Sequence, residues 1–190
     1  MKKVFLALAI LLCTQGFAKD NDRYAVATFR GLSDDNNIFL FARALRQNLP
    51  SPHGRPIARA VYQDLPCRLQ DLRIIGAEAD KCITDKKELK KFQKDHEKAV
   101  ESIVKPGSNY YVKVGSHAGE IFYCDVSDDR RNFRLSLVSA GYAIPINDDS
   151  EVLLKAAEEA KEAKRGMYSA KFWDVTNCIL NGVPMPKKDR

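Results

Sequence analysis

Residues 72–114 read LRIIGAEADKCITDKKELKKFQKDHEKAVESIVKPGSNYYVKV, and the apolar pattern changes twice within them. Residues 72–75 form a short apolar run before Gly76, which is typical of a strand. Over residues 85–104 the apolar positions recur at helical spacing, so we expect a helix with one buried stripe. Residues 110–114 alternate again, as a strand does. The stripe of the helix consists of Leu89, Phe92, Ala99, Val100 and Ile103.

The flanking segments extend this pattern in both directions. Upstream, residues 24–29 and 38–41 carry strand-forming side chains around a turn cluster at 33–37, which predicts a hairpin. A long loop is expected at 46–56, which holds three prolines and a glycine, and a strand at 57–62. Downstream, we expect a strand at 121–126, helices at 133–140 and 148–165, and a tail at 174–190.

The order of these elements is hairpin, strands, helix, strands, helix, helix. Regular alternation of strand and helix would indicate a doubly wound parallel sheet, and this chain does not alternate in that way. The sequence therefore predicts an α+β domain built on a small antiparallel barrel.

The N-terminus resembles a secretory signal peptide. Residues 1–18 combine a basic start, an almost continuous apolar run and a small residue, Ala18, before the expected cleavage point. Cleavage would remove two lysines and no acid, so the net charge of +6 would fall to +4. The signal peptide predicts an exported protein, either periplasmic or secreted. No other apolar stretch approaches the length of a membrane span, so we expect the mature protein to be soluble.

Four cysteines remain after that cleavage: Cys67, Cys82, Cys124 and Cys178. An even number of cysteines in an exported chain indicates two disulfides, for which three pairings are possible. The chain has no CxxC motif and no Cys/His group with zinc spacing, so a metal role for these cysteines is disfavoured.

Three segments together resemble the staphylococcal-nuclease-like (thermonuclease) family. Residues 132–143 (NFRLSLVSAGYA) are similar to the family's helix ending in LV-x-x-G-x-A. Residues 73–79 (RIIGAEA) are similar to its RL-x-G-I-D-A strand end, and 153–173 (LLKAAEEAKEAKRGMYSAKFW) to its last helix. The resemblance covers about residues 23–174 and implies a five-stranded OB-type antiparallel barrel with three helices. It divides the chain into a signal peptide at 1–18, this domain at 19–174 and a tail at 175–190.

The resemblance also implies a chemistry, hydrolysis of phosphodiester bonds in DNA and RNA with one calcium ion. Calcium needs acidic oxygen ligands, the attacking water needs a carboxylate, and the phosphate needs two arginines. The first arginine matches Arg73 and one acidic ligand matches Glu78. The catalytic carboxylate position holds Lys81, with Asp80 one place early. The second acidic ligand falls on Asn36, with Asp35 beside it, and no arginine precedes Ile121 where the second one is expected.

These departures favour a binding module with a degenerate site. Its expected partner is nucleic acid or a protein of the cell envelope. The alternative is a weak calcium-dependent nuclease in which Arg73 and Asp80 act on the substrate, while Glu78, Asp35 and Asn36 hold the metal.

A basic stripe on the predicted helix is a second candidate surface. Lys86, Lys90 and Lys94 recur every fourth residue and could follow a phosphate backbone. Acidic residues share the same helix, so a solvated face laced with ion pairs is the other interpretation.

The likeness also suggests a disulfide pairing. A bond from Cys82 to Cys178 would tie the tail to the active-site side of the barrel, and Cys67 could then pair with Cys124 across the sheet. The other two pairings, 67–82 with 124–178 and 67–178 with 82–124, stay open.

Overall fold

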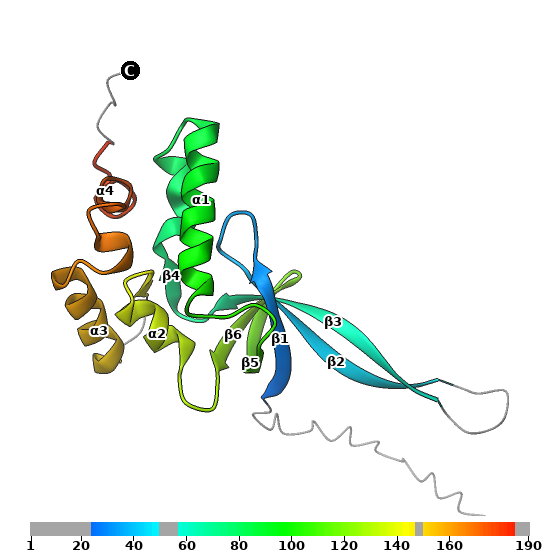
Figure 1. Ribbon diagram of the computed structural model, residues 1–190. Coiled ribbons are helices and arrows are strands. Elements are labelled where there is room, and N and C mark those ends of the chain that lie inside the picture. The colour runs from blue at the N-terminus through cyan, green and yellow to red at the C-terminus, as the bar shows by residue number, and fades with distance from the viewer. Residues whose placement is uncertain (1–23, 50–56, 147–149, 185–190) are drawn as a thin grey trace, which may run out of the picture.

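The computed structural model describes residues 24–49, 57–146 and 150–184. The predicted signal peptide at 1–18, most of the predicted loop at 46–56 and the last six residues of the predicted tail lie outside these ranges. Figure 1 shows a small barrel with helices packed to one side and a long two-stranded arm projecting from the other.

Five strands close into the barrel in the order β1-β2-β3-β6-β5. All neighbouring strands are antiparallel except β3 and β6, which are parallel. The α+β barrel expected from the sequence is thus confirmed, but a purely antiparallel arrangement was wrong. An odd number of strands cannot alternate direction around a closed ring, so at least one pair must be parallel. The strands are β1 (Ala25–Leu32), β2 (Phe39–Leu49), β3 (Ile57–Leu69), β5 (Asn109–Ala118) and β6 (Ile121–Ser127).

Alternate residues of the strands fill the barrel, because successive side chains of a strand point to opposite faces. Phe29 of β1 and Phe41 of β2 are buried, with ring centroids 5.3 Å apart. Phe133, at the start of helix α2 (Phe133–Ser139), packs its ring 4.6 Å from that of Tyr110 on β5. Helix α1 (Lys86–Glu101) contributes the fully buried Val100 to the same core.

The segment that carries Arg73 leaves the barrel. Strand β4 (Leu72–Ile74) pairs with β7 (Ala143–Pro145) in a separate two-stranded sheet. A 3₁₀ segment, η1 (Ile75–Lys81), then leads to α1. The side chain of Asp85 caps α1 by accepting a hydrogen bond from the Glu88 backbone, which confirms the predicted start of the helix.

Four α-helices are present in the described ranges, where three were expected. Helix α3 (Glu151–Glu162) leads through the 3₁₀ turn η2 (Gly166–Tyr168) to the additional helix α4 (Trp173–Asn181). Helix α4 begins the segment that the sequence analysis assigned to a tail. It buries Val175 and Thr176, and it ends at Gly182, whose left-handed backbone is typical of a helix C-terminus.

Two disulfides join distant parts of the chain. Cys67 and Cys124 link the parallel strands β3 and β6 inside the barrel, where both residues are fully buried. Cys82, just after η1, is bonded to Cys178 on α4. This is the pairing suggested from the sequence, and the two alternatives are excluded. In the described part of the chain, no helix is both long enough and apolar enough to cross a membrane.

Candidate functional site

A cavity of about 380 Å³ opens where the ends of β3 and β4, segment η1 and strand β6 meet. Arg73 and Glu78, both predicted as site residues, line it together with Asn37 of the β1–β2 turn. The cavity is also lined by Arg68 and Asp71, which were not predicted as site residues, and by Tyr123. Two of the five residues predicted for the catalytic and metal site, Arg73 and Glu78, thus line one cavity.

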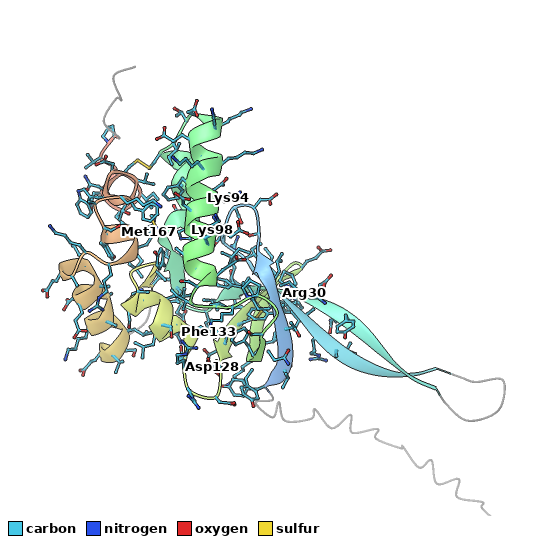
Figure 2. The ribbon with its side chains drawn as sticks, viewed as in Figure 1. Arg30, Lys94, Lys98, Asp128, Phe133 and Met167 are labelled. Atoms are coloured by element: carbon cyan, nitrogen blue, oxygen red, sulfur yellow. A yellow bond between two sulfur atoms is a disulfide. The ribbon has the colours of Figure 1, made fainter. Side chains whose placement is uncertain are left out.

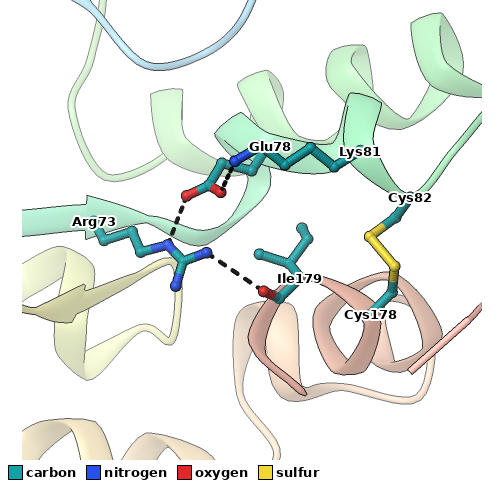
Figure 3. Close-up of a disulfide and its surroundings, with 6 residues drawn as sticks. All are labelled: Arg73, Glu78, Lys81, Cys82, Cys178 and Ile179. Atoms are coloured by element: carbon teal, nitrogen blue, oxygen red, sulfur yellow. Dashed lines mark hydrogen bonds and ion pairs between the residues drawn. A yellow bond between two sulfur atoms is a disulfide. The ribbon is translucent and has the colours of Figure 1, made fainter. Parts of the chain in front are cut away.

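Glu78 is held between two cations (Figure 3). The Nε of Arg73 donates to one carboxylate oxygen and the Nζ of Lys81 to the other, each at 2.6 Å. The hydrogen bond from Arg73, supported by that from Lys81, lowers the pKa of Glu78 below its ordinary value. Both oxygens that a metal would use are therefore engaged by cationic groups of the chain itself.

The local backbone explains why the side chains of Arg73, Glu78 and Lys81 contact one another. The 3₁₀ segment is broken at Glu78, whose φ and ψ of −106° and 19° are not helical. Its carboxylate turns back toward Arg73 on β4, while Lys81 lies at the last turn of the segment. Arg73 also donates to the backbone oxygen of Ile179 on α4, at 3.4 Å. Helix α4, which is bonded to Cys82 through Cys178, therefore contacts the Arg73 side chain (Figure 3).

The other predicted acidic residues lie outside the cavity lining. Asp80 is exposed at the end of η1. Asp35 accepts hydrogen bonds from the Ser33 hydroxyl and, at 3.1 Å, from the Asn37 backbone, so it stabilises its own turn. Among the described residues, no three His, Cys, Asp or Glu side chains are grouped so that they could hold a metal ion.

Asn36 has a structural role in place of the predicted metal role. It is 2% exposed, and its side-chain amide donates to the Gln93 backbone oxygen of α1 at 3.0 Å. Its φ of 56° lies in the left-handed region, which asparagine tolerates better than most residues. Asn36 therefore anchors the β1–β2 turn to α1.

Arg68 is the most informative residue that sequence reasoning missed. It stands between the buried residues Cys67 and Leu69, so its own side chain points away from the barrel core. The parallel register pairs it with Tyr123 of β6. Its Nε is buried and has no hydrogen-bond partner among the described residues. The alternation of buried and exposed residues along β3 could have predicted that the Arg68 side chain points outward. Its pairing with Tyr123 could not be predicted in this way, because it depends on how the barrel closes.

The lysines of α1 are available to solvent. Lys86, Lys90 and Lys94 are exposed, and none of the three forms an ion pair within the described ranges. Asp95 of the same helix pairs with Lys171, at 2.9 Å, and that hydrogen bond lowers its pKa. Figure 2 shows Lys94 and Lys98 on this helix.

Comparison with known proteins does not place the chain in a family. A scan against protein-family models finds no match, and a search of curated proteins finds none.

Proposed function

We propose that the protein is an exported, non-catalytic module that binds nucleic acid and is a divergent relative of the thermonuclease-like family. The barrel of five strands and the helices that cover it are compatible with the OB-type fold that the resemblance implies. Two disulfides support an oxidising compartment outside the cytosol.

The observation that carries this proposal is the charge of the Arg73–Glu78–Lys81 cluster. Two cations surround one carboxylate, so the cluster has a net charge of +1. A calcium site needs several anionic oxygens, and a hydrolytic site needs a carboxylate to activate water. A cluster with excess positive charge repels calcium but attracts a phosphate group.

The lysines of α1 extend this positive charge. Lys86, Lys90 and Lys94 recur at one turn of the helix, which places their ammonium groups roughly 6 Å apart along its axis. Along one strand of duplex DNA the phosphates recur about every 3.4 Å of the axis, so the lysine spacing corresponds to about every second phosphate. The lysine face can therefore contribute affinity for nucleic acid without any sequence preference.

Binding and hydrolysis of labelled DNA and RNA oligonucleotides test the proposal. Wild-type protein, Arg73→Ala and Glu78→Gln would be compared by fluorescence anisotropy, with calcium, magnesium or EDTA. We expect no cleavage in any condition, binding that does not need metal, weaker binding by Arg73→Ala, and several-fold tighter binding by Glu78→Gln because the net charge rises. Arg130→Ala, at an exposed turn, is the matched control for loss of an arginine.

Metal-dependent cleavage that disappears in Arg73→Ala would overturn the proposal. It would support instead the alternative from the sequence, a weak calcium-dependent nuclease. Absence of binding at low salt, in folded protein with both disulfides formed, would also contradict the proposal and direct attention to a protein partner.

A further inference from the structure

A second cavity, of about 480 Å³, opens between the C-terminal end of α3, the turn η2 and the first turn of α4. It shares no lining residue with the cavity at Arg73. Figure 1 shows α3 and α4 at the end of the molecule opposite to the projecting strands β2 and β3. Pockets that hold small ligands have volumes of about 300–1,000 Å³, so this one is large enough for a ligand. We call it the Trp173 pocket, and its lining residues are Lys161, Lys164, Tyr168, Ala170, Trp173 and Asp174.

The backbone around this pocket is tightly held. Gly166, which begins η2, has a φ of 52°, and a Cβ added to it would lie 2.3 Å from the backbone oxygen of Ala140. The Met167 backbone donates to the Gly141 oxygen at 3.0 Å, which fixes η2 against the end of α2. The hydroxyl of the buried Thr176 donates to the Met167 backbone oxygen, so α4 is tied to η2 as well. The pocket is therefore formed before any ligand arrives, which lowers the cost of binding.

The apolar part of the pocket has an aromatic wall. Tyr168 is 6% exposed, whereas Trp173 beside it in the lining is 41% exposed. Trp173 is also the only tryptophan of the chain. An indole ring left this open to solvent next to a cavity gives up much of the free energy of its burial. It offers instead a flat surface on which another planar ring can stack.

The polar part of the pocket is cationic. Lys161 and Lys164 are exposed. The ion pair recorded on α3 joins Lys155 to Glu159, and within the described ranges neither lysine of the pocket takes part in one. With the carboxylate of Asp174, the lining has a net charge of +1. Two ammonium groups are therefore available to an anionic group of a ligand.

The chemistry of the pocket fits a nucleotide, which joins a planar base to a phosphate. We propose that the Trp173 pocket is a subsite for one unpaired nucleotide of a nucleic-acid strand. The base stacks on the ring of Trp173, and the phosphates beside it bind Lys161 and Lys164. The base must be unpaired because bases inside a duplex already stack on one another. This inference rests on the proposed nucleic-acid binding, and it assigns to that binding a single-stranded form and a place on the fold.

Size and charge disfavour other occupants. A stable interface between proteins buries about 800 Å² on each partner, whereas six residues line this pocket. A second copy of the chain would bring the same positive net charge, +6 over the whole sequence, and would be repelled. One nucleotide needs neither a large interface nor an opposite charge on a second protein.

The single tryptophan makes the subsite directly observable, because a base stacked on the indole ring quenches its fluorescence. The full oxidised protein would be titrated with a short single DNA strand, with the same sequence as a duplex, and with polyphosphate, which has the charge but no bases. We expect the single strand to quench the emission of Trp173, and duplex DNA and polyphosphate to leave it close to that of the free protein. Arg73→Ala should bind the strand more weakly and still show the quenching at saturation.

Variants of the ring test stacking by the anisotropy of a labelled single strand. Trp173→Leu keeps an apolar side chain but removes the flat ring, and it should bind about 5-fold more weakly or worse. Trp173→Phe keeps a ring and should recover most of the affinity. Both should bind duplex DNA as wild type does. Circular dichroism would confirm that the variants fold.

Variants of the rim test the phosphate contacts. Lys161→Gln/Lys164→Gln should lower the slope of log affinity against log salt by about 1.4 on a single strand, about 0.7 for each phosphate that is no longer neutralised. The matched control is Lys105→Gln/Lys155→Gln, which removes two exposed lysines that do not line the pocket. It should leave this slope close to that of wild type.

The outcomes separate the two proposals. If the wild-type protein binds no strand and no duplex, the proposed function fails and the subsite fails with it. If the strand binds without quenching Trp173, and Trp173→Leu binds it as wild type does, only the subsite is overturned. Equal quenching by polyphosphate would overturn it too, because charge alone would then change the emission. So would an equal loss of single-strand and duplex binding in Trp173→Leu.

Discussion

Among single residues, His96 is the polar side chain whose burial has the clearest consequence. It is fully buried on α1, its ring stacks on Phe92, and neither ring nitrogen has a hydrogen-bond partner in the described ranges. The backbone of Gly76 lies so close to the His96 ring that a Cβ added at this glycine would clash with it. Only a glycine at position 76 leaves room for the His96 ring, and η1, which carries Glu78, can therefore pack against α1.

Burial lowers the pKa of His96 to about 4. In the unfolded chain its pKa would be about 6.5, so the unfolded state binds the proton first as the pH falls. Protonation of this group therefore costs no stability well above pH 6.5, and its cost grows as the pH falls from there to about 4. At pH 4.5 the cost amounts to roughly 2–3 kcal/mol.

We therefore expect His96→Leu to lose less stability than wild type between pH 7 and pH 4.5. Urea unfolding at both pH values, with the disulfides intact, would measure the difference. Carboxylates titrate in both proteins, so the comparison isolates the histidine. Equal losses in the two proteins would contradict the burial of a neutral ring.

Among the elements of the fold, α1 is the one whose first residue and buried face could both be predicted from the sequence. Asp85 caps it as the sequence indicated, and Phe92 and Val100 of the expected stripe are buried. The lysines stay outside because the buried stripe occupies the opposite positions of the 3.6-residue turn. What the sequence left open was whether these lysines face solvent, and the structure shows that Lys86, Lys90 and Lys94 are exposed.

Replacing Lys86, Lys90 and Lys94 together by glutamine should weaken nucleic-acid binding in a salt-dependent way. Each lysine that neutralises a phosphate contributes about 0.9 to the slope of log affinity against log salt on duplex DNA. If all three lysines bind phosphates, the slope of the triple variant falls by about 3. Anisotropy titrations over a salt series would measure it.

The control for that series is the triple replacement of Lys155, Lys161 and Lys164, which removes the same charge from α3 and its C-terminal end. It should leave the slope on duplex DNA close to that of wild type. An equal decrease in both variants would mean that net charge, and not the lysine face, determines binding.

At the scale of the whole molecule, the two disulfides stabilise different parts of the structure. Cys67–Cys124 lies inside the barrel, whereas Cys82–Cys178 attaches α4 to the segment that carries Glu78. The second bond closes a loop with a sequence separation of 96 residues, and loops of this size carry a large entropic stabilisation. Because α4 is peripheral, its release need not unfold the barrel.

We expect Cys82→Ala/Cys178→Ala to fold with a loosened α4. Amide hydrogen exchange should accelerate in Trp173–Asn181 and in η1, and stay slow in the barrel strands. Exchange detected by mass spectrometry on proteolytic fragments would measure this. Cys67→Ala/Cys124→Ala is the matched comparison and should instead accelerate β3 and β6. Uniform acceleration in both variants would indicate one cooperative unit.

Much of the architecture could be predicted because it depends on local patterns. The α1 helix, its cap and the hairpin of β1 and β2 follow from periodicity and turn residues over a few positions. The two-stranded arm of β2 and β3 was missed because prolines and a glycine at 46–56 led us to extend the predicted loop over the end of β2. The fourth helix was missed because the segment after Trp173 is short, although Val175 and Ile179 have helical spacing and Gly182 suits a helix end.

The α+β class, the number of disulfides and the positive charge of the chain were all readable from the residues alone, since composition and periodicity are properties of neighbouring positions. The contacts of the site were not, because they depend on the path of the backbone. Arg73 and Glu78 meet because β4 leaves the barrel and η1 breaks its helix, and Arg68 meets Tyr123 because five strands must close with one parallel pair. The contact of Arg68 with Tyr123 depends on strand register across 55 residues, and no local pattern encodes that register.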